Sequence, residues 1–382
     1  MLLCIAVGAR AELPVAVPVD GPPLRGELAA VDAKWNLSFD SQGKGRRLPA
    51  AELLCWGTCA QPARGPIVVT ADAGLLAADV FAADKETISA DSPCFGELKL
   101  PLKSLAGVVF DPPADRQQCD RLLDRVARAK ETSDRVVLHS GDEITALLLG
   151  LRDDTVKLQT DAGPLDIGID RIAALIFNPA LRQQTPRQDI RAWAGFADGS
   201  LLPAEQLILG EKSLKLTTGG GQTWATSAEQ LVYLMPLGDR VTYLSDLQPD
   251  AYRHVPYLNL SWSYRRDRNV TGGRLRSAGR LYPKGLGMHS AARLTYLLNE
   301  PCKRFQAEVG IDDSTAGSGS VKVRVYIDGA KKYSSETIRG GMAPVPISVD
   351  LEGAKRLDLI VDFAERADEQ DHADWLNARL VR

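Results

Sequence analysis

Two short blocks near the C-terminus contain the residues best suited to chemistry. Residues 282–289 end on a histidine, and residues 371–375 hold two aspartates, a histidine and a tryptophan. Histidine, aspartate, asparagine and arginine are polar groups that can form paired hydrogen bonds with neighbouring hydroxyls. Tryptophan adds a flat apolar face that packs against the C–H side of a sugar ring. These residue types together could bind a carbohydrate.

The candidate carbohydrate site draws on both blocks and on the strands beside them. His289 follows two glycines, Gly285 and Gly287, that allow the backbone to bend, so we expect it just outside a strand ladder. The full set of candidates is His289, Trp262, Lys284, Asp371, Trp375, Asn377 and Arg379.

Alternation in the last strand separates these candidates into two faces. The face that holds Leu376 and Leu380 is expected to meet the core. It also holds His372 and Asp374, which serve either as a buried polar pair or as ligand contacts. The opposite face holds Asp371, Ala373, Trp375, Asn377 and Arg379.

Catalytic and metal sites find little support in the sequence. It contains no G-x-S-x-G, H-E-x-x-H or P-loop motif, and a glycosidase would need two carboxylates across a cleft. Asp312 and Asp313 precede a Gly/Ser loop and could ligate calcium, but two adjacent carboxylates alone do not define such a site. We therefore predict no catalytic residue, no resident metal and no cofactor.

Length and composition place the chain among folded proteins of several domains. It has 382 residues, 45% of them apolar and 25% charged, which favours two to four domains. The formal net charge of −3 gives no general attraction to nucleic acid. No apolar run approaches the ~20 residues that span a bilayer. The sequence thus predicts no nucleic-acid partner and no membrane span.

The N-terminal residues and the cysteines indicate the cellular compartment of the protein. Residues 2–7 are apolar and residues 9–11 read Ala-Arg-Ala, which favours the end of a clipped secretory signal over residues 1–11, although an N-terminal strand is the alternative. Of six cysteines only Cys55 and Cys59 are close in sequence, so we expect small buried hydrophobes with one disulfide at most. The predicted location is secreted, periplasmic or cell-envelope.

Comparing the chain with itself indicates a repeat in the first 240 residues. Four glycines, each near an aspartate, precede a short apolar stretch, a turn and a second alternating run. The distances from Gly21 to Leu53, Gly74 to Leu105, Gly141 to Ile172 and Gly199 to Leu231 are 32, 31, 31 and 32 positions. A period of two with Gly/Asp turns predicts small antiparallel β units, which we expect to pack in pairs as SH3-like or Sm-like barrels do.

The remaining segments divide the chain. Residues 116–130 have one apolar face and predict a connector helix that covers a sheet edge. The expected order is two β units in residues 12–110, the helical connector in 111–133, and two β units in 134–240. Residues 180–190 read as a polar linker between the third and fourth units. Three prolines then favour a linker over 241–256.

Residues 257–382 read as strand after strand with no good helix. Residues 321–327 alternate apolar and polar side chains, Asp328-Gly329 favours a tight hairpin turn, and residues 357–363 alternate again. About eight strands in this length predict a jelly-roll β-sandwich. The overall fold class is therefore all-β, with one connector helix.

The C-terminal blocks resemble the NPCBM family of carbohydrate-binding modules, first noted beside family 98 glycoside hydrolases. The matching stretches are residues 261–263, 281–290, 305, 309–313, 319–321, 326–329 and 371–375. The resemblance covers about residues 257–382 and implies a galactose-binding-like jelly roll that binds galactose-containing glycans. Met288-His289-Ser290 and the basic loop 265–269 depart from the usual pattern and leave the exact sugar open.

Three functions remain open at this point. The favoured one is non-catalytic binding of a glycan by the C-terminal sandwich, with the N-terminal repeats as scaffold. A second is a structural or interaction protein whose repeats bind a protein partner and whose sandwich has lost its sugar site. A third is an accessory chain of a glycoside hydrolase, as the family resemblance implies.

Overall fold

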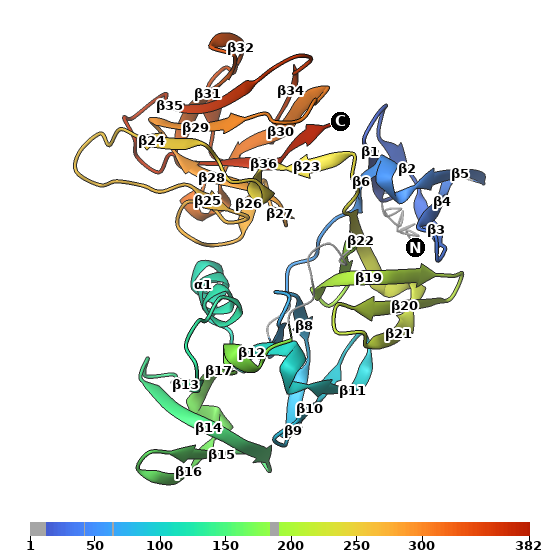
Figure 1. Ribbon diagram of the computed structural model, residues 1–382, viewed down its shortest axis with the longest axis vertical. Helices are drawn as coiled ribbons and strands as arrows, with labels where there is room; N and C mark the ends of the chain where they lie inside the picture. The colour runs from blue at the N-terminus through green and yellow to red at the C-terminus, as the bar shows by residue number, and fades with distance from the viewer. Residues whose placement is uncertain (1–12, 42, 63–64, 184–190) are drawn as a thin grey trace, which may run out of the picture.

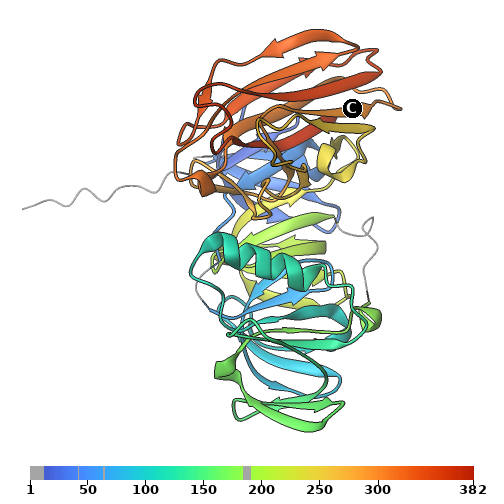
Figure 2. The same cartoon turned by 90° about the vertical axis from the view of Figure 1, so that its left-hand side faces the viewer.

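The computed structural model describes residues 13–41, 43–62, 65–183 and 191–382. Figure 1 shows a β-sandwich of C-terminal strands at one end of the molecule and the strands of residues 143–168 at the other, with a helix between them. The view turned by 90° shows the same order along the long axis (Figure 2). The expected all-β class with one connector helix is confirmed within these residues. The predicted signal segment, residues 1–11, lies outside them.

The N-terminal part contains one order of elements four times. Each unit has a first strand, a meander of three longer strands, a 3₁₀ turn and a last strand. The first unit is β1 (Val15–Pro18), β2 (Leu24–Arg25), β3 (Glu27–Val31), β4 (Asn36–Ser41), β5 (Lys44–Pro49), η1 (Ala50–Glu52) and β6 (Leu53–Gly57). The second is β7 (Ile67–Thr70), β8 (Leu75–Ala77), β9 (Asp79–Ala83), β10 (Thr87–Ser92), β11 (Gly96–Pro101), η2 (Leu102–Ser104) and β12 (Leu105–Val109).

The third and fourth units follow the same order. The third is β13 (Asp134–Leu138), β14 (Glu143–Arg152), β15 (Thr155–Thr160), β16 (Gly163–Gly168), η3 (Ile169–Arg171) and β17 (Ile172–Ile176), followed by the turn η4 (Pro179–Leu181). The fourth is β18 (Ala192–Phe196), β19 (Leu201–Leu209), β20 (Ser213–Thr218), β21 (Thr223–Ser227), η6 (Ala228–Gln230) and β22 (Leu231–Pro236). In each unit the last strand pairs antiparallel with the first.

The units pair in a nested order. Strand β6 of the first unit pairs with β22 of the fourth, and β12 of the second pairs with β17 of the third. Alternating side chains of the meanders, such as Leu214 and Leu216 in β20, point inward and are fully buried. Because buried residues of all four units join one hydrophobic cluster, no unit has to bury a core alone.

Helix α1 (Arg116–Ala127) lies between the second and third units. It starts where Asp115 accepts a hydrogen bond from the amide of Gln118 at 2.8 Å, a standard N-cap. Its apolar face, with Leu123 and Val126, packs on strands of both units. Asp120 of the same helix contacts the sandwich. The helix ends three residues earlier than the sequence predicts. Through Asp120 it also connects the N-terminal units with the sandwich.

The C-terminal domain is a sandwich of two antiparallel sheets. One has the order β25 (Arg265–Arg266), β28 (Gly285–His289), β36 (His372–Val381), β30 (Arg304–Ile311) and β34 (Val345–Asp350), with β23 (Val241–Tyr243) beside β36. The other has the order β24 (Ala251–His254), β29 (Ala292–Leu297), β35 (Arg356–Phe363), β31 (Ser320–Ile327) and β32 (Ala330–Ser334), with β33 (Ile338–Arg339) beside β31. The hairpin β26 (Leu275–Ser277) and β27 (Arg280–Tyr282) and the turns η7 (Leu244–Asp246) and η8 (Asp313–Thr315) complete it.

Residues 241–256 are part of this sandwich and not a linker. Strand β23 pairs with the end of β36, and β24 pairs with β29, so each sheet gains a strand from this interval. The prolines that favoured a linker lie outside the strands: Pro236 ends β22, while Pro249 and Pro256 flank β24. In this interval proline marks strand ends without preventing pairing.

The sandwich is held to the N-terminal part by a buried ion pair and by hydrogen bonds. Asp120 of α1 pairs with the guanidinium of Arg276, with 3.1 Å between Oδ1 and Nη2, and also accepts from the amide of Arg274 at 2.9 Å. At a second contact, Arg304 donates to the carbonyl of Val19 at 2.8 Å. Because these bonds tie helix and first unit to different strands, the sandwich has one fixed position.

Two further findings concern the cysteines and the possibility of a membrane span. Cys55, Cys59, Cys94, Cys119 and Cys302 are free thiols, so none of these five forms a disulfide here. Among the described residues, no helix is both long enough and apolar enough to span a membrane.

Candidate functional site

The site is built on the outer face of the sheet that contains β28 and β36. Leu286 and Met288 point into the sandwich core, so alternation turns His289 outward. Ala373 and Trp375 likewise point into the core, which turns His372 outward. The two histidines stand directly opposite each other in the ladder, with ring centroids 5.8 Å apart. His289 therefore lies inside a strand ladder and not beyond its end.

Trp262 covers this pair of histidines. Its indole stacks on the imidazole of His289 with centroids 4.8 Å apart and an angle of 1° between the planes. It lies 5.6 Å from the ring of His372. The tryptophan segment is held by β24, where Tyr252 donates to its carbonyl at 2.8 Å and His254 accepts from its amide at 3.3 Å. The indole itself is half-buried, so one part of it stays open to solvent.

The three imidazoles of this cluster are electrically neutral near pH 7. Burial and, to a smaller extent, the neighbouring His372 together lower the pKa of His289 to about 4. Burial also lowers the pKa values of His372 and His254. A neutral imidazole has one donor and one acceptor nitrogen. Within the described residues Nδ1 of His372 is buried and has no hydrogen-bond partner.

Asp371 stands at the start of β36 beside the cluster. Its Oδ1 accepts from the amide of Ser320 at 2.9 Å, and the hydroxyl of Ser290 lies 3.5 Å from Nδ1 of His289. Burial raises the pKa of Asp371 to about 6, while the hydrogen bonds from Ser320 and Ser290 act in the opposite direction. The carboxyl group therefore changes charge close to neutral pH.

Asp374 follows His372 by two residues and stands opposite Gly287 in the ladder between β36 and β28. Burial raises its pKa well above the usual value, and the nearby charge of Asp312 acts in the same direction. The oxygens of Asp312 already accept from Asn269 and Ser314 and from the amide of Arg276. These contacts give the Asp312 carboxylate a structural role. In the described part of the chain, no three His, Cys, Asp or Glu side chains are grouped to hold a metal.

A bulge in β36 places Trp375 in the core. Asn377 has a left-handed φ of 49°, and Asn377 and Ala378 together oppose the single residue Ala307 of β30. The alternation therefore reverses at this point: Trp375 and Leu380 both face the core, whereas Leu376 packs on the outer side. With an exposed fraction of 0%, Trp375 offers no face to a ligand, which corrects our expectation from simple alternation.

The comparisons with known proteins agree with this sandwich. Residues 240–381 match the NPCBM/NEW2 domain.

Two curated relatives share part of this domain. The protein named "Putative endo-alpha-N-acetylgalactosaminidase" of Renibacterium salmoninarum is 37% identical over 110 residues, which cover 29% of this chain and 7% of the relative. "Alpha-1,3-galactosidase B" of Akkermansia muciniphila is 32% identical over 117 residues, 30% of this chain and 15% of the relative. The matches thus span a small part of each relative's length.

Among solved structures, one similar chain is a CBM51 module of a Clostridium perfringens GH95 protein in complex with methyl-galactose. It is 25% identical, covers 37% of this chain and 99% of its own, and has a TM-score of 0.34. A second is CBM51-2 of Clostridium perfringens ZmpB in complex with GlcNAc. It is 29% identical, covers 46% of this chain and 37% of its own, and has a TM-score of 0.35.

The other candidates lie away from the histidine cluster of the NPCBM domain. Lys284 is buried at the junction with the N-terminal units and pairs with Asp246 and Asp267, at 2.5 and 2.9 Å. Asn377 and Arg379 line a cavity of about 360 Å³ beside the first unit. The structure therefore brings His289 and Trp262 together, buries Asp371 completely, and places Lys284, Asn377 and Arg379 against the N-terminal part.

Sequence reasoning missed His254 and placed His372 on the core face of its strand, whereas its side chain faces outward. The chain has four histidines, and three of them, His254, His289 and His372, converge in the NPCBM domain. Their scarcity was a usable signal, since a rare polar side chain that recurs in one domain points to a common site. His254 was missed because residues 241–256 were taken as a linker.

Proposed function

We propose that the NPCBM domain binds a glycan at the histidine cluster, defined as Trp262, His254, His289 and His372 with Asp371 beside them. The observation that carries this proposal is the stack of Trp262 on His289. It joins an aromatic platform to polar groups that can form paired hydrogen bonds, which are the two requirements for holding a pyranose. The match to a family of carbohydrate-binding modules supports it.

The chemistry of the cluster suits hydroxyl groups. The imidazoles of His289 and His372 are neutral, so each has one donor nitrogen and one acceptor nitrogen. The exposed part of Trp262 would take the apolar face of the ring. In this arrangement the sugar approaches beside Trp262, and the buried imidazoles contact the hydroxyls at its edge.

The preferred class of sugar is galactose or N-acetylgalactosamine in a terminal position. This choice rests on the two curated relatives, whose names describe enzymes that act on such sugars, and on the family resemblance. The departures at Met288 and at the loop 265–269 change the sequence around the site. Because of these departures, measurement decides between galactose and N-acetylgalactosamine.

The proposed role is binding without catalysis. Hydrolysis of a glycosidic bond needs two carboxyl groups on opposite sides of the sugar. At the cluster the two carboxyl groups, Asp371 and Asp374, are both fully buried, and Asp374 shares its surroundings with Asp312. An accessory role beside a glycoside hydrolase, in the cell envelope or outside the cell, fits this arrangement.

Calorimetry with the full chain tests the proposal. We expect a galactoside and an N-acetylgalactosaminide to bind, and Trp262→Ala and His289→Ala to weaken binding. His139→Ala is the matched control, because His139 is a half-exposed histidine of the third unit, far in sequence and contact from the cluster. Absence of binding to any neutral glycan at millimolar concentration would sink the proposal.

The N-terminal units suggest a second role as an interaction scaffold built from copies of one module. The second and third units each expose a large apolar side chain, Phe81 at 52% and Leu147 at 55%. Such side chains are common at protein interfaces. Pull-down with the full chain and with Phe81→Ser and Leu147→Ser would test this role; a partner retained by both variants would contradict it.

A further inference from the structure

A second cavity lies where the sandwich meets the N-terminal part. Its volume is about 380 Å³, within the range of pockets for small ligands. It is lined by the second unit (Asp72, Leu75), by α1 (Asp120, Leu123, Arg128), by the fourth unit (Trp193, Leu201) and by the sandwich (Asp267, Arg268, Arg274, Tyr282, Lys284). We call it the junction pocket. None of the residues of the histidine cluster lines it.

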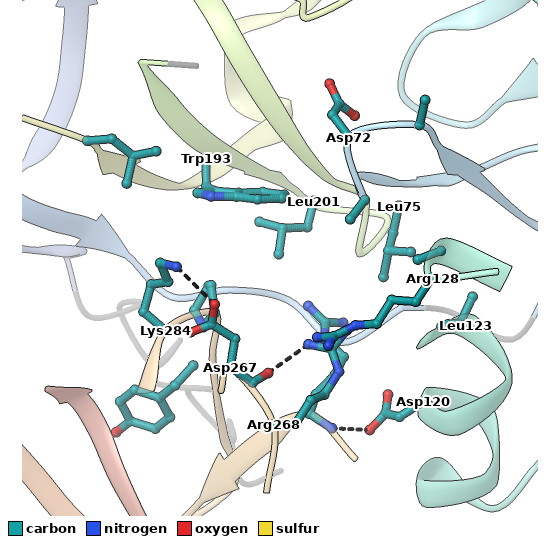
Figure 3. Close-up of a pocket in the computed structure, with 17 residues that line it drawn as sticks. Asp72, Leu75, Asp120, Leu123, Arg128, Trp193, Leu201, Asp267, Arg268 and Lys284 are labelled. Atoms are coloured by element: carbon teal, nitrogen blue, oxygen red, sulfur yellow. Dashed lines mark hydrogen bonds and ion pairs between the residues drawn. The ribbon is translucent and has the colours of Figure 1, made fainter. Parts of the chain in front are cut away.

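One wall of the junction pocket is apolar and flat. Trp193 of β18 is half-buried, and Leu75 and Leu201 flank it. Figure 3 shows the indole of Trp193 across the pocket from Lys284, Asp267 and Arg268. An exposed indole face opposite polar side chains is the arrangement that takes a sugar ring, with C–H groups on one side and hydroxyls on the other.

The opposite wall consists of charged groups held in place by hydrogen bonds. Nζ of Lys284 lies 2.9 Å from Oδ2 of Asp267. Arg268 donates to the backbone carbonyl of Asp267 at 2.7 Å, so Lys284 contacts the side chain of Asp267 and Arg268 contacts its main chain. They come from the basic loop 265–269 and the Lys284 turn, which were conspicuous in the sequence but do not belong to the histidine cluster.

Carboxylates are unevenly shared at this wall: Lys284 has two, Asp246 and Asp267, whereas the guanidinium groups have fewer. The single carboxylate of Asp124 serves both Arg128, at 2.8 Å, and Arg268, at 2.7 Å. Arg274 has an exposed fraction of only 8%, and no carboxylate among the described residues pairs with its side chain. Its Nη1 and the Nε of Arg268 have no hydrogen-bond partner in the described part of the chain.

A buried guanidinium without an ion pair is costly, because burial removes its hydration. Burial indeed lowers the pKa of Arg274 from its usual value. An anionic group in the pocket would remove this cost. Guanidinium groups favour carboxylates, since their donors match the two carboxylate oxygens.

We propose that the junction pocket binds an acidic sugar, a pyranose that bears a carboxylate. The ring packs on Trp193, and the carboxylate lies among the guanidiniums of Arg128, Arg268 and Arg274. Lys284 and Asp267 contact the hydroxyls. The ligand would touch the second unit, α1, the fourth unit and the sandwich at once, so its binding would also stabilise their contact.

Calorimetry on the full chain with N-acetylneuraminic acid and glucuronic acid tests this inference, with galactose as the neutral comparison. We expect at least one acidic sugar to bind, and galactose not to displace it. Trp193→Ala and Arg268→Gln should each weaken that binding about tenfold or more. Arg266→Gln, an exposed arginine of the same loop that does not line the pocket, should leave it unchanged.

Two further variants keep the outcome clear. Arg128→Glu reverses a charge at the pocket on a side chain that is 60% exposed, so it should weaken binding even if Trp193→Ala fails to fold. Trp262→Ala removes the platform of the histidine cluster and should leave the acidic sugar bound. The inference is overturned if neither acidic sugar binds at millimolar concentration, if galactose competes equally, or if only Trp262→Ala abolishes binding.

Discussion

His289 lies directly opposite His372 in the ladder between β28 and β36, and both imidazoles face away from the sandwich core. One side chain therefore cannot be removed without changing the surroundings of the other. Trp262 contacts both rings, so the three residues act as one unit. The predictions that follow use this arrangement.

We expect His289→Ala and His372→Ala both to weaken galactoside binding, by about 1–3 kcal/mol each. Because the two side chains share Trp262, their effects should not add, and the coupling in a double-mutant cycle should be about 0.5–3 kcal/mol. Calorimetry on the two single variants and the double variant measures it. Strict additivity would contradict a shared site.

The stability of the domain should depend on pH through His289. Its pKa is about 4 in the folded chain and 6.5 ordinarily, so between these values the unfolded chain binds the extra proton. The contribution of His289 is present above pH 6.5 and is lost as the pH falls toward 4. Thermal melts at pH 5 and pH 7.5 should show that His289→Asn removes this dependence.

Asp371 should act in the opposite direction. Its pKa is raised from 3.8 to about 6, so the folded chain keeps a proton that the unfolded chain releases. Its contribution is greatest below pH 3.8 and is lost as the pH rises through 6. Relative to wild type, Asp371→Asn should therefore gain stability at pH 7.5 and not at pH 4. An equal gain at both values would contradict the raised pKa.

Two tryptophans form a matched comparison. Trp375→Ala should destabilise the sandwich by about 3–5 kcal/mol, because the ring is fully buried against Phe305. Trp262→Ala should instead abolish most galactoside binding with a much smaller loss of stability, since its ring is half-exposed. Chemical denaturation and calorimetry on both variants separate the two roles. A reversed result would assign Trp375 to the site.

The ion pair of Asp120 with Arg276 should fix the sandwich to α1. Asp120→Asn leaves a buried guanidinium without its partner, which typically costs about 3–5 kcal/mol. We expect scanning calorimetry to show two separate unfolding transitions in this variant. Arg116→Ala, at an exposed position of the same helix, is the control and should melt like wild type. A single unchanged transition in Asp120→Asn would show that other contacts suffice.

The sequence predicted those features that depend on local pattern. The apolar face of residues 116–130 predicted α1, and alternation such as that of residues 321–327 predicted the sandwich strands. The blocks around His289 and Asp371 predicted the sandwich family, because they occur in its order and spacing. Each of these signals lies within a few neighbouring residues.

The remaining features depend on contacts between distant segments. The bulge at Asn377 needs the register of β30, so alternation alone assigned Trp375 and Leu376 to the wrong faces. His254 reaches the cluster through the pairing of β24 with β29, which no local pattern marks. Lys284 turns to the junction because Asp246 and Asp267 pair with it there, and neither is close to it in sequence.

The nested pairing of the four units constrains the order in which the chain can fold during synthesis. The second and third units are consecutive, so β12 and β17 can meet soon after the third unit leaves the ribosome. The first unit must wait for β22, which is made last of the N-terminal strands, and until then the edge of β6 is open. Long-range pairing of this kind slows folding. The exposed edge of β6 is therefore where a nascent chain would most benefit from a chaperone.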